Sequence, residues 1–136
     1  MADFSLEDLK TLRERLGTGM VETKNALVEA GGDLDKATEL LRLKGAKGNA
    51  KRADRSTSEG LVAAKENGST TTLIELSCET DFVAKGEKFV TLGDTVLDAI
   101  VAAGASTPEE GLVAATGTQT VADLISNEAA ILGEKI

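Results

Sequence analysis

Histidine, tryptophan and tyrosine are absent from this 136-residue sequence, and cysteine and proline each occur only once. Without histidine the chain lacks the usual general base near neutral pH, the commonest metal ligand and every Ser-His or Cys-His nucleophile pair. The lone Cys78 excludes an internal disulfide and any CxxC pair, which is compatible with a reducing compartment. We therefore expect neither an enzyme, nor a bound metal, nor a cofactor.

Positive charge is also scarce, because 15 Lys+Arg residues stand against 23 Asp+Glu and give a net charge of −8. This balance excludes a globally basic nucleic-acid binder and favours a protein partner. No apolar run approaches the ~20 residues of a membrane span, and the charged start MADFSLEDLK does not resemble a signal peptide. We expect a cytoplasmic protein without membrane contact.

Charge divides the chain into two parts. Residues 1–55 hold 11 basic and 10 acidic residues, whereas residues 56–136 hold 4 and 13. Six cations gather near the boundary, among glycines and where the apolar periodicity stops: Arg42, Lys44, Lys47, Lys51, Arg52 and Arg55. The pattern predicts an N-terminal module over 1–45, a basic linker over 46–56 and a second unit over 57–136.

The first part has the pattern of three short helices. Ser5 and Asp8 form a capping-box pair ahead of leucines spaced by three and four residues. Glycines follow each apolar stripe, as at helix ends. The predicted helices cover residues 6–16, 19–30 and 34–44. They would share one small aliphatic core, near the lower size limit for independent folding.

The second part changes to a period of two and then returns to the helical period. Alternating residues predict strands over 60–65 and 70–78 joined by a glycine-containing turn, with Cys78 on the buried face. Helices are expected over 87–103, briefly after Pro108, and from a Thr120 cap to about residue 132. The fold class is therefore α+β, a hairpin covered by helices. Because a two-stranded hairpin leaves an edge open, we expect the chain to be cut short.

One segment invites a functional interpretation. In Glu79–Lys85 a large ring, Phe82, follows a carboxylate, Asp81, where the second strand meets the next helix. In one interpretation Thr80 or Asp81 caps that helix and Phe82 fills the core. In the other, the ring and the carboxylate form an exposed wedge that engages a partner. Spacing alone does not separate the two.

Two stretches resemble one known family. The run LRERLGTGMVETKNALVEAGGDLDKATELLRLKGA over 12–46 is similar to the first signature of bacterial elongation factor Ts, and ELSCETDFVAK over 75–85 is similar to the second. The resemblance covers essentially the whole chain and thins between residues 103 and 118. Ser77 stands where the family usually has Asn, Leu16 where Thr is common, and Val21 where Met is common.

The resemblance implies an N-terminal ubiquitin-associated-like module of three helices, followed by part of an α+β core. It further implies a translation elongation factor that exchanges guanine nucleotide on elongation factor Tu, binding it with GDP and without nucleotide. Such a protein is not an enzyme in the bond-making sense. The family's second subdomain, coiled coil and C-terminal module have no counterpart in the sequence.

Site residues also follow from the resemblance. Leu12, Met20 and Val21 would present the module's apolar contact to a helix of the partner. The segment Thr80, Asp81, Phe82 and Val83 would disturb the partner's Mg²⁺ site. From the residues alone, Leu12 and Met20 are equally well explained as core packing, because both lie on inward-facing stripes.

Three other functions stay open. The helical module can serve as a general helix-binding unit without exchange activity, with the acidic part as a spacer. The basic stretch can contact RNA, although it lacks the interleaved aromatics of such surfaces. An enzyme that uses Cys78 would need a reactive thiol. No P-loop, Rossmann glycine motif, GxSxG, HExxH or EF-hand loop supports another chemistry.

Overall fold

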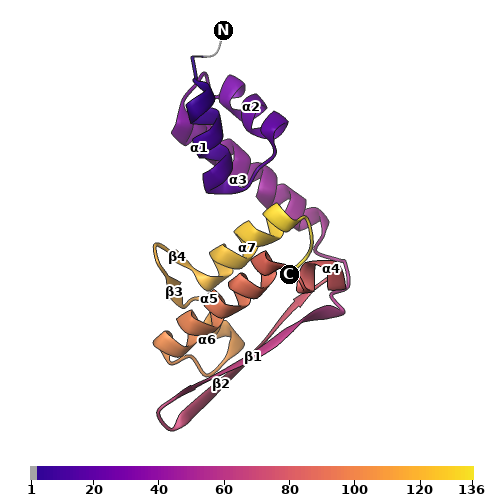
Figure 1. Ribbon diagram of the computed structural model, residues 1–136, viewed down its shortest axis with the longest axis vertical. Helices are drawn as coiled ribbons and strands as arrows, with labels where there is room; N and C mark the ends of the chain where they lie inside the picture. Colours follow the sequence, from indigo (N-terminus) through magenta and orange to yellow (C-terminus); the bar gives the residue numbers. More distant parts are fainter. Residues whose placement is uncertain (1–2) are drawn as a thin grey trace.

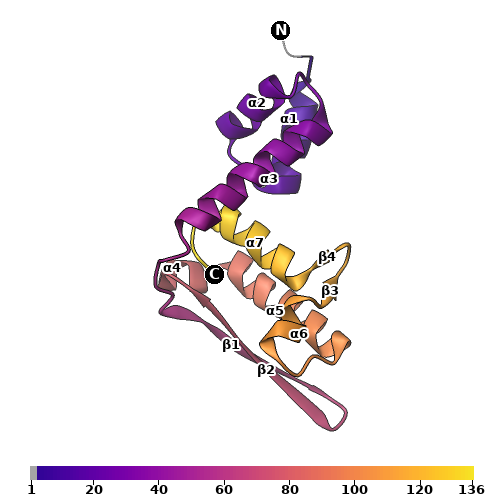
Figure 2. The ribbon, with the colours of Figure 1, turned by 180° about the vertical axis from the view of Figure 1, so that it is seen from behind.

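The computed structural model describes residues 3–136, and it places a helical module at one end of an elongated molecule and a β-hairpin at the other (Figure 1). The helices α5 and α7 lie between them, as the view from behind also shows (Figure 2). Helices and strands are mixed in the order α1–α3, β1, β2, α4–α6, β3, β4, α7. The predicted α+β class is confirmed.

The N-terminal module consists of α1 (Leu6–Leu16), α2 (Met20–Glu29) and the first half of α3 (Leu34–Lys51). Ser5 and Asp8 form the predicted capping box, in which the Ser5 hydroxyl accepts from the Asp8 amide at 3.1 Å. Asp33 caps α3 by accepting two backbone amides. The shared core comprises Leu9, Leu12, Ala26, Leu27, Ala37 and Leu41. The predicted aliphatic core is confirmed.

The third helix runs on to Lys51, beyond the end that the sequence predicts near residue 45. Gly45 and Gly48 are poor helix formers, so local propensity alone ends the helix there. Packing against α7 overrides that preference, because a Cβ at Gly45 would lie 3.0 Å from the Ala130 Cβ. The Asn49 side-chain amide also donates to the Ser126 carbonyl at 2.8 Å. Half of the predicted linker is therefore helix.

Strands β1 (Glu59–Asn67) and β2 (Thr70–Cys78) form the predicted antiparallel hairpin, with Asn67 opposite Thr70 and Glu59 opposite Cys78. Alternate β2 residues face the helices, as the period-two pattern predicts. Cys78 is fully buried there, as expected. The buried core of this part comprises Leu76, Cys78, Val83, Phe89, Leu92, Val96, Ala99, Ala114 and Val121.

Four helices accompany the hairpin: α4 (Asp81–Ala84), α5 (Glu87–Ala103), α6 (Pro108–Leu112) and α7 (Val121–Leu132). The bounds of α5 and the Thr120 cap of α7 agree with the prediction. Between α6 and α7 a second small hairpin pairs β3 (Ala115–Thr116) with β4 (Gln119–Thr120). Two-residue strands are too short to produce a sequence period, so this pair was not predicted.

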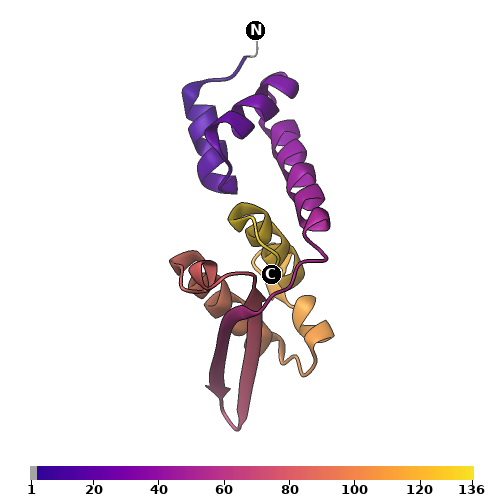
Figure 3. The ribbon, with the colours of Figure 1, turned by 90° about the vertical axis from the view of Figure 1, so that its right-hand side faces the viewer.

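The module and the hairpin part meet where the second half of α3 packs against α7 (Figure 3). Besides the Gly45 and Asn49 contacts, a Cβ at Gly17 would lie 3.1 Å from the Ile131 side chain. Backbone and side-chain contacts thus join the two parts directly. In the part of the chain that the structure describes, no helix is both long and apolar enough to cross a membrane.

Candidate functional site

The segment Thr80–Val83 lies where β2 ends and the four-residue helix α4 begins. Thr80 is the N-cap of α4, with extended backbone angles and a hydroxyl that accepts from the Val83 amide at 3.3 Å. The cap turns the chain sharply away from the strand. Asp81 and Phe82 therefore lie in the first turn of a short helix.

Phe82 is 85% exposed, the largest exposed fraction among the exposed large apolar residues of the described chain. This finding excludes the interpretation in which Phe82 fills the core. Asp81 is also exposed, and its carboxylate pairs at 3.4 Å with Lys85, the residue that follows α4. We call Asp81 and Phe82 together the α4 surface. The ring and the carboxylate stand side by side in sequence, and both are open to solvent.

Val83 points the other way, because it is 9% exposed and belongs to the buried core. It anchors α4 to the rest of the fold. Of the four predicted residues in this segment, Thr80, Asp81 and Phe82 are exposed and Val83 is core. The Thr80 hydroxyl is engaged within the chain by Glu134 and the Val83 amide, so Asp81 and Phe82 are the stronger candidates for contact with a partner.

Glu134 supports the start of this segment from a distant part of the chain. Its Oε1 accepts the backbone amides of Glu79 at 3.1 Å and Thr80 at 3.0 Å, and its Oε2 accepts the Thr80 hydroxyl at 2.6 Å. The sequence offered no signal for these contacts beyond the glycine that precedes Glu134. The chain end therefore lies beside α4 (Figure 1).

Cys78 lies just before the site, in surroundings that do not favour a reactive thiol. It is fully buried, and its Sγ donates to the Thr80 carbonyl at 3.3 Å. Burial raises the pKa of the Cys78 thiol, and the nearby Glu134 and Glu59 carboxylates raise it further. Because the thiolate is the nucleophile, this environment opposes cysteine chemistry.

The second predicted site lies on the helical module. Met20 and Val21 begin α2 and are 47% and 72% exposed. We call these two residues the module surface. Leu12, in contrast, is only 1% exposed and packs in the module core, so the surface contact expected of it is corrected to a core role. Burial of its apolar side chain among α1, α2 and α3 explains the difference.

Local hydrogen bonds hold the turn that presents the module surface. The buried Thr23 hydroxyl donates to the Gly19 carbonyl at 2.8 Å. The Thr18 hydroxyl lies 2.7 Å from Thr23 Oγ1 and is the donor there, because the Thr23 proton is already used. The Arg13 Nε also donates to the Thr18 carbonyl at 3.4 Å. The turn between α1 and α2 is therefore tied to residues close in sequence.

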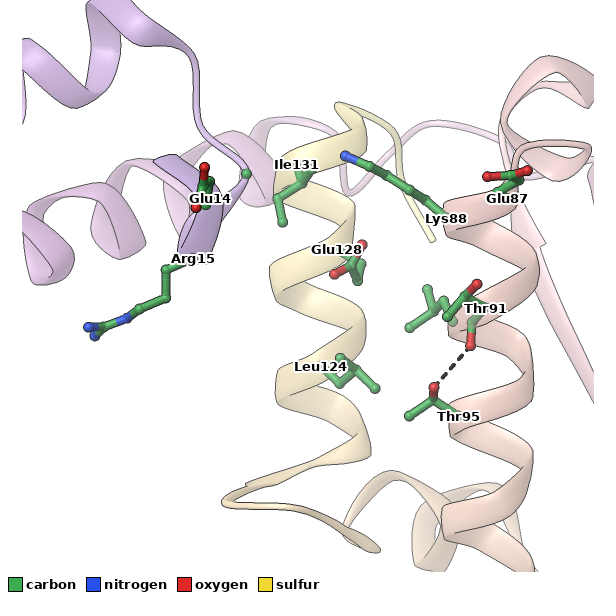
Figure 4. Close-up of a pocket in the computed structure, with 11 residues that line it drawn as sticks. Glu14, Arg15, Glu87, Lys88, Thr91, Thr95, Leu124, Glu128 and Ile131 are labelled. Atoms are coloured by element: carbon green, nitrogen blue, oxygen red, sulfur yellow. Dashed lines mark hydrogen bonds between the residues drawn. The ribbon is translucent and has the colours of Figure 1, made fainter. Parts of the chain in front are cut away.

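A groove of about 440 Å³ lies between α1, α5 and α7. Thr91 of α5 and Glu128 of α7 face each other across it, and Glu14 of α1 stands near its end (Figure 4). None of its described lining residues belongs to a predicted site. Across residues 3–136 no group of three or more Cys, Asp or Glu side chains is arranged to hold a metal ion.

The basic stretch is part of α3 and the turn after it, and two of its cations have partners within the chain. Arg52 donates to the Asn49 side chain at 2.9 Å, and Arg55 pairs with Glu79 at 3.4 Å. The first contact is local to the end of α3, and the second holds the turn against the hairpin part. They give the stretch a structural use that needs no RNA.

Comparison with known proteins gives one consistent result. The family model described as Elongation factor TS matches residues 79–136. The chain is 76% identical over 137 aligned residues to elongation factor Ts of Leifsonia xyli subsp. xyli, covering 100% of the chain and 50% of that relative. It is 67% identical to elongation factor Ts of Clavibacter sepedonicus and 52% identical to that of Micrococcus luteus, covering 50% and 49% of them. The chain spans about half the length of these relatives.

Proposed function

Because the chain belongs to the elongation factor Ts family, we propose that it is a translation elongation factor that binds elongation factor Tu with GDP and promotes GDP release. The proposal includes the nucleotide-free form of elongation factor Tu as the second partner. It also makes the chain an exchange factor rather than an enzyme, and its place of action the cytoplasm, where translation proceeds.

The exposure of Phe82 is the observation that carries this proposal. A phenyl ring that is 85% exposed on a capped turn is not needed for packing in the chain itself. Rigid aromatic side chains are preferred anchors at protein interfaces, because they bury much area for little lost freedom. Phe82 is suited to insert into a partner, and Asp81 brings a carboxylate to the same place.

The chemistry of the partner explains why that combination would release a nucleotide. Mg²⁺ neutralises phosphate charge and holds the nucleotide by its phosphates. An inserted ring with an adjacent carboxylate can rearrange polar groups near that metal without contact to the base. In this proposal Phe82 supplies the apolar insertion and Asp81 perturbs the polar groups.

The module surface has a different task in the proposal. Met20 and Val21 offer apolar area to a helix of the partner and so supply affinity. The two tasks are thermodynamically connected, since the factor by which the chain weakens GDP binding equals the factor by which GDP weakens binding of the chain. Exchange therefore needs a contact that distinguishes the two states of the partner.

Replacement of Phe82 by alanine tests the proposal. In release of fluorescent GDP from elongation factor Tu at fixed Mg²⁺, F82A should lose about tenfold or more of the acceleration, as expected when an interface anchor is truncated. Its free energy of unfolding should change by less than about 0.5 kcal/mol, because the ring is exposed.

The matched control is Leu73→Ala, since Leu73 is 67% exposed on β2, away from α4. This variant should accelerate GDP release as well as the unchanged chain does. Equal activity of F82A and the unchanged chain would contradict the role of the ring.

A second candidate function is a general helix-binding module without exchange activity. The exposed Met20 and Val21 favour it, because an apolar patch on a helical module suits a helical partner. Binding of the chain to elongation factor Tu without any acceleration of GDP release would support this alternative.

A further inference from the structure

We infer that Glu134 is a positioning residue for exchange, which fixes the direction of Phe82 without touching the partner; this inference rests on the function proposed above. The carboxylate collects three donors from the two residues that lead into α4. Hydrogen bonds to an ionised carboxylate are among the stronger ones in proteins. The start of α4 is thereby tied to the end of α7.

The α4 surface needs such support because α4 is too short to be a stable helix by itself. A helix of four residues has hardly any internal hydrogen bonds, and isolated helices of this size are unstable in water. Phe82 itself is exposed and so makes few contacts that could orient it. Its direction depends on two anchors, Val83 in the core and the Glu134 carboxylate at the cap.

The geometry of Glu134 depends in turn on the residues around it. Gly133 ends α7 with φ of 73°, a left-handed conformation that favours glycine, and this turns the chain toward β2. The Lys135 amide donates to the Glu79 carboxylate at 3.1 Å, and Lys135 Nζ donates to the Ala53 carbonyl at 2.7 Å. The backbone on both sides of Glu134 is therefore fixed, by Gly133 before it and by Lys135 after it.

The contacts of Glu134 differ from ordinary surface contacts in what they join. Thr80 Oγ1 donates to Glu134 and at the same time accepts from the Val83 amide, so one hydroxyl connects the carboxylate to the first turn of α4. Loss of the carboxylate removes the acceptor of two backbone amides and of that hydroxyl. The backbone at Glu79 and Thr80 would then be more mobile, and the Phe82 ring would point in a wider range of directions.

The experiment compares Glu134→Ala and Glu134→Gln in the 136-residue chain. Glu134→Ala should lower the hydrogen-exchange protection of the Glu79 and Thr80 amides about tenfold, as expected for lost bonds to a charged acceptor. The maximal rate of GDP release from elongation factor Tu should fall by a similar factor of about ten. The chain concentration at half-maximal rate should change less than about threefold, because the module surface is intact.

Glu134→Gln keeps an oxygen for the two amides and should recover most of the protection and of the maximal rate. The matched control is Glu66→Ala, which removes an exposed glutamate near the tip of the hairpin and should change neither quantity. Unchanged amide protection in Glu134→Ala, or a maximal rate equal to that of the unchanged chain, would overturn the positioning role. If the unchanged chain itself gives no acceleration, the proposed function fails instead.

Discussion

The module surface and the α4 surface each expose a large apolar side chain, but they are held in opposite ways. Met20 and Val21 follow a turn whose hydrogen bonds join residues at most five positions apart. Phe82 follows Thr80, whose backbone amide donates to Glu134, a residue 54 positions further along the chain. The first surface depends on residues close to it in the sequence, and the second depends on a contact with the residues that follow α7.

The difference separates two kinds of sensitivity. A surface built from local contacts persists as long as its own helices fold. A surface built from distant contacts is lost when either end loosens, even if the core remains packed. Binding through the module and exchange through α4 should therefore respond to different substitutions, and the four changes below test that separation.

The largest effect is expected from Leu12→Ala. Removal of a fully buried leucine from a six-residue core should lower the stability of the module by about 2–5 kcal/mol, because it removes apolar burial and leaves a cavity. Hydrogen exchange should show faster opening of α1–α3 and unchanged protection of β1 and β2. The control is Leu6→Ala on the same helix, where the side chain is 78% exposed. Equal loss of protection in the hairpin would mean that the two parts unfold as one unit.

Thr23→Val should have a smaller effect on the same module. The valine keeps the shape of the buried threonine but loses the donor to Gly19 and the acceptor for Thr18. We expect a loss of about 1–2 kcal/mol in the free energy of unfolding, measured by denaturant titration. Thr38→Val is the matched control, because Thr38 makes a single such bond, to the Leu34 carbonyl at 2.8 Å. A larger loss for Thr38→Val would contradict the local support assigned to Thr23.

Val21→Ser should change binding rather than stability. Because Val21 is 72% exposed, its loss should weaken affinity for elongation factor Tu by about 1 kcal/mol, or about fivefold, as for a modest interface residue. The maximal rate of GDP release should stay the same. Val62→Ser is the control, since Val62 is a valine of similar exposure, 69%, on the hairpin. A fall in the maximal rate with unchanged affinity would reverse the roles given to the two surfaces.

Acidification should have the smallest effect, at the first turn of α1. Hydrogen bonds from the Ser5 amide and hydroxyl hold the pKa of Asp8 below its ordinary value of 3.8. Because the pKa of Asp8 is lower in the folded state, the carboxylate stabilises that state at any pH above the pKa of the unfolded chain. This contribution disappears as the pH falls through the pKa of the folded state. NMR titration of the α1 amides should show the change, and Asp8→Asn should abolish it. An Asp8 carboxyl that titrates above 3.8 would contradict the capping role.

Elements whose signals are local could be predicted from the sequence. The capping boxes at Ser5 and Thr120, the period of α5 and the hairpin alternation all specify structure within a few residues. The extension of α3 could not be predicted, because it depends on contact between Gly45 and Ala130 of α7, which lies 85 positions later in the sequence. Propensity at glycine says nothing about which helix will pack against it.

The candidate site could be predicted only in part. The sequence singled out the segment around Phe82 but did not fix its direction, because a capped turn can bury or expose the ring with the same spacing. The direction follows from Val83, which occupies the core and leaves Phe82 outside. Leu12 and Met20 lie on similar stripes, yet only Met20 is exposed. The sequence does not predict the role of Glu134, since no local pattern marks a carboxylate that accepts backbone amides from a distant part of the chain.

The continuity of α3 from the module into its contact with α7 sets a rule for how the chain can change in length. Each residue added to an α-helix turns everything before it by about 100° and shifts it by about 1.5 Å. One residue inserted between Leu41, in the module core, and Gly45, against α7, would swing Met20 and Val21 round to another side of the molecule. Insertion of about seven residues would restore the facing within about 20°, at the cost of about 10 Å of separation. The helix therefore sets both the angle and the spacing at which a partner meets the two surfaces.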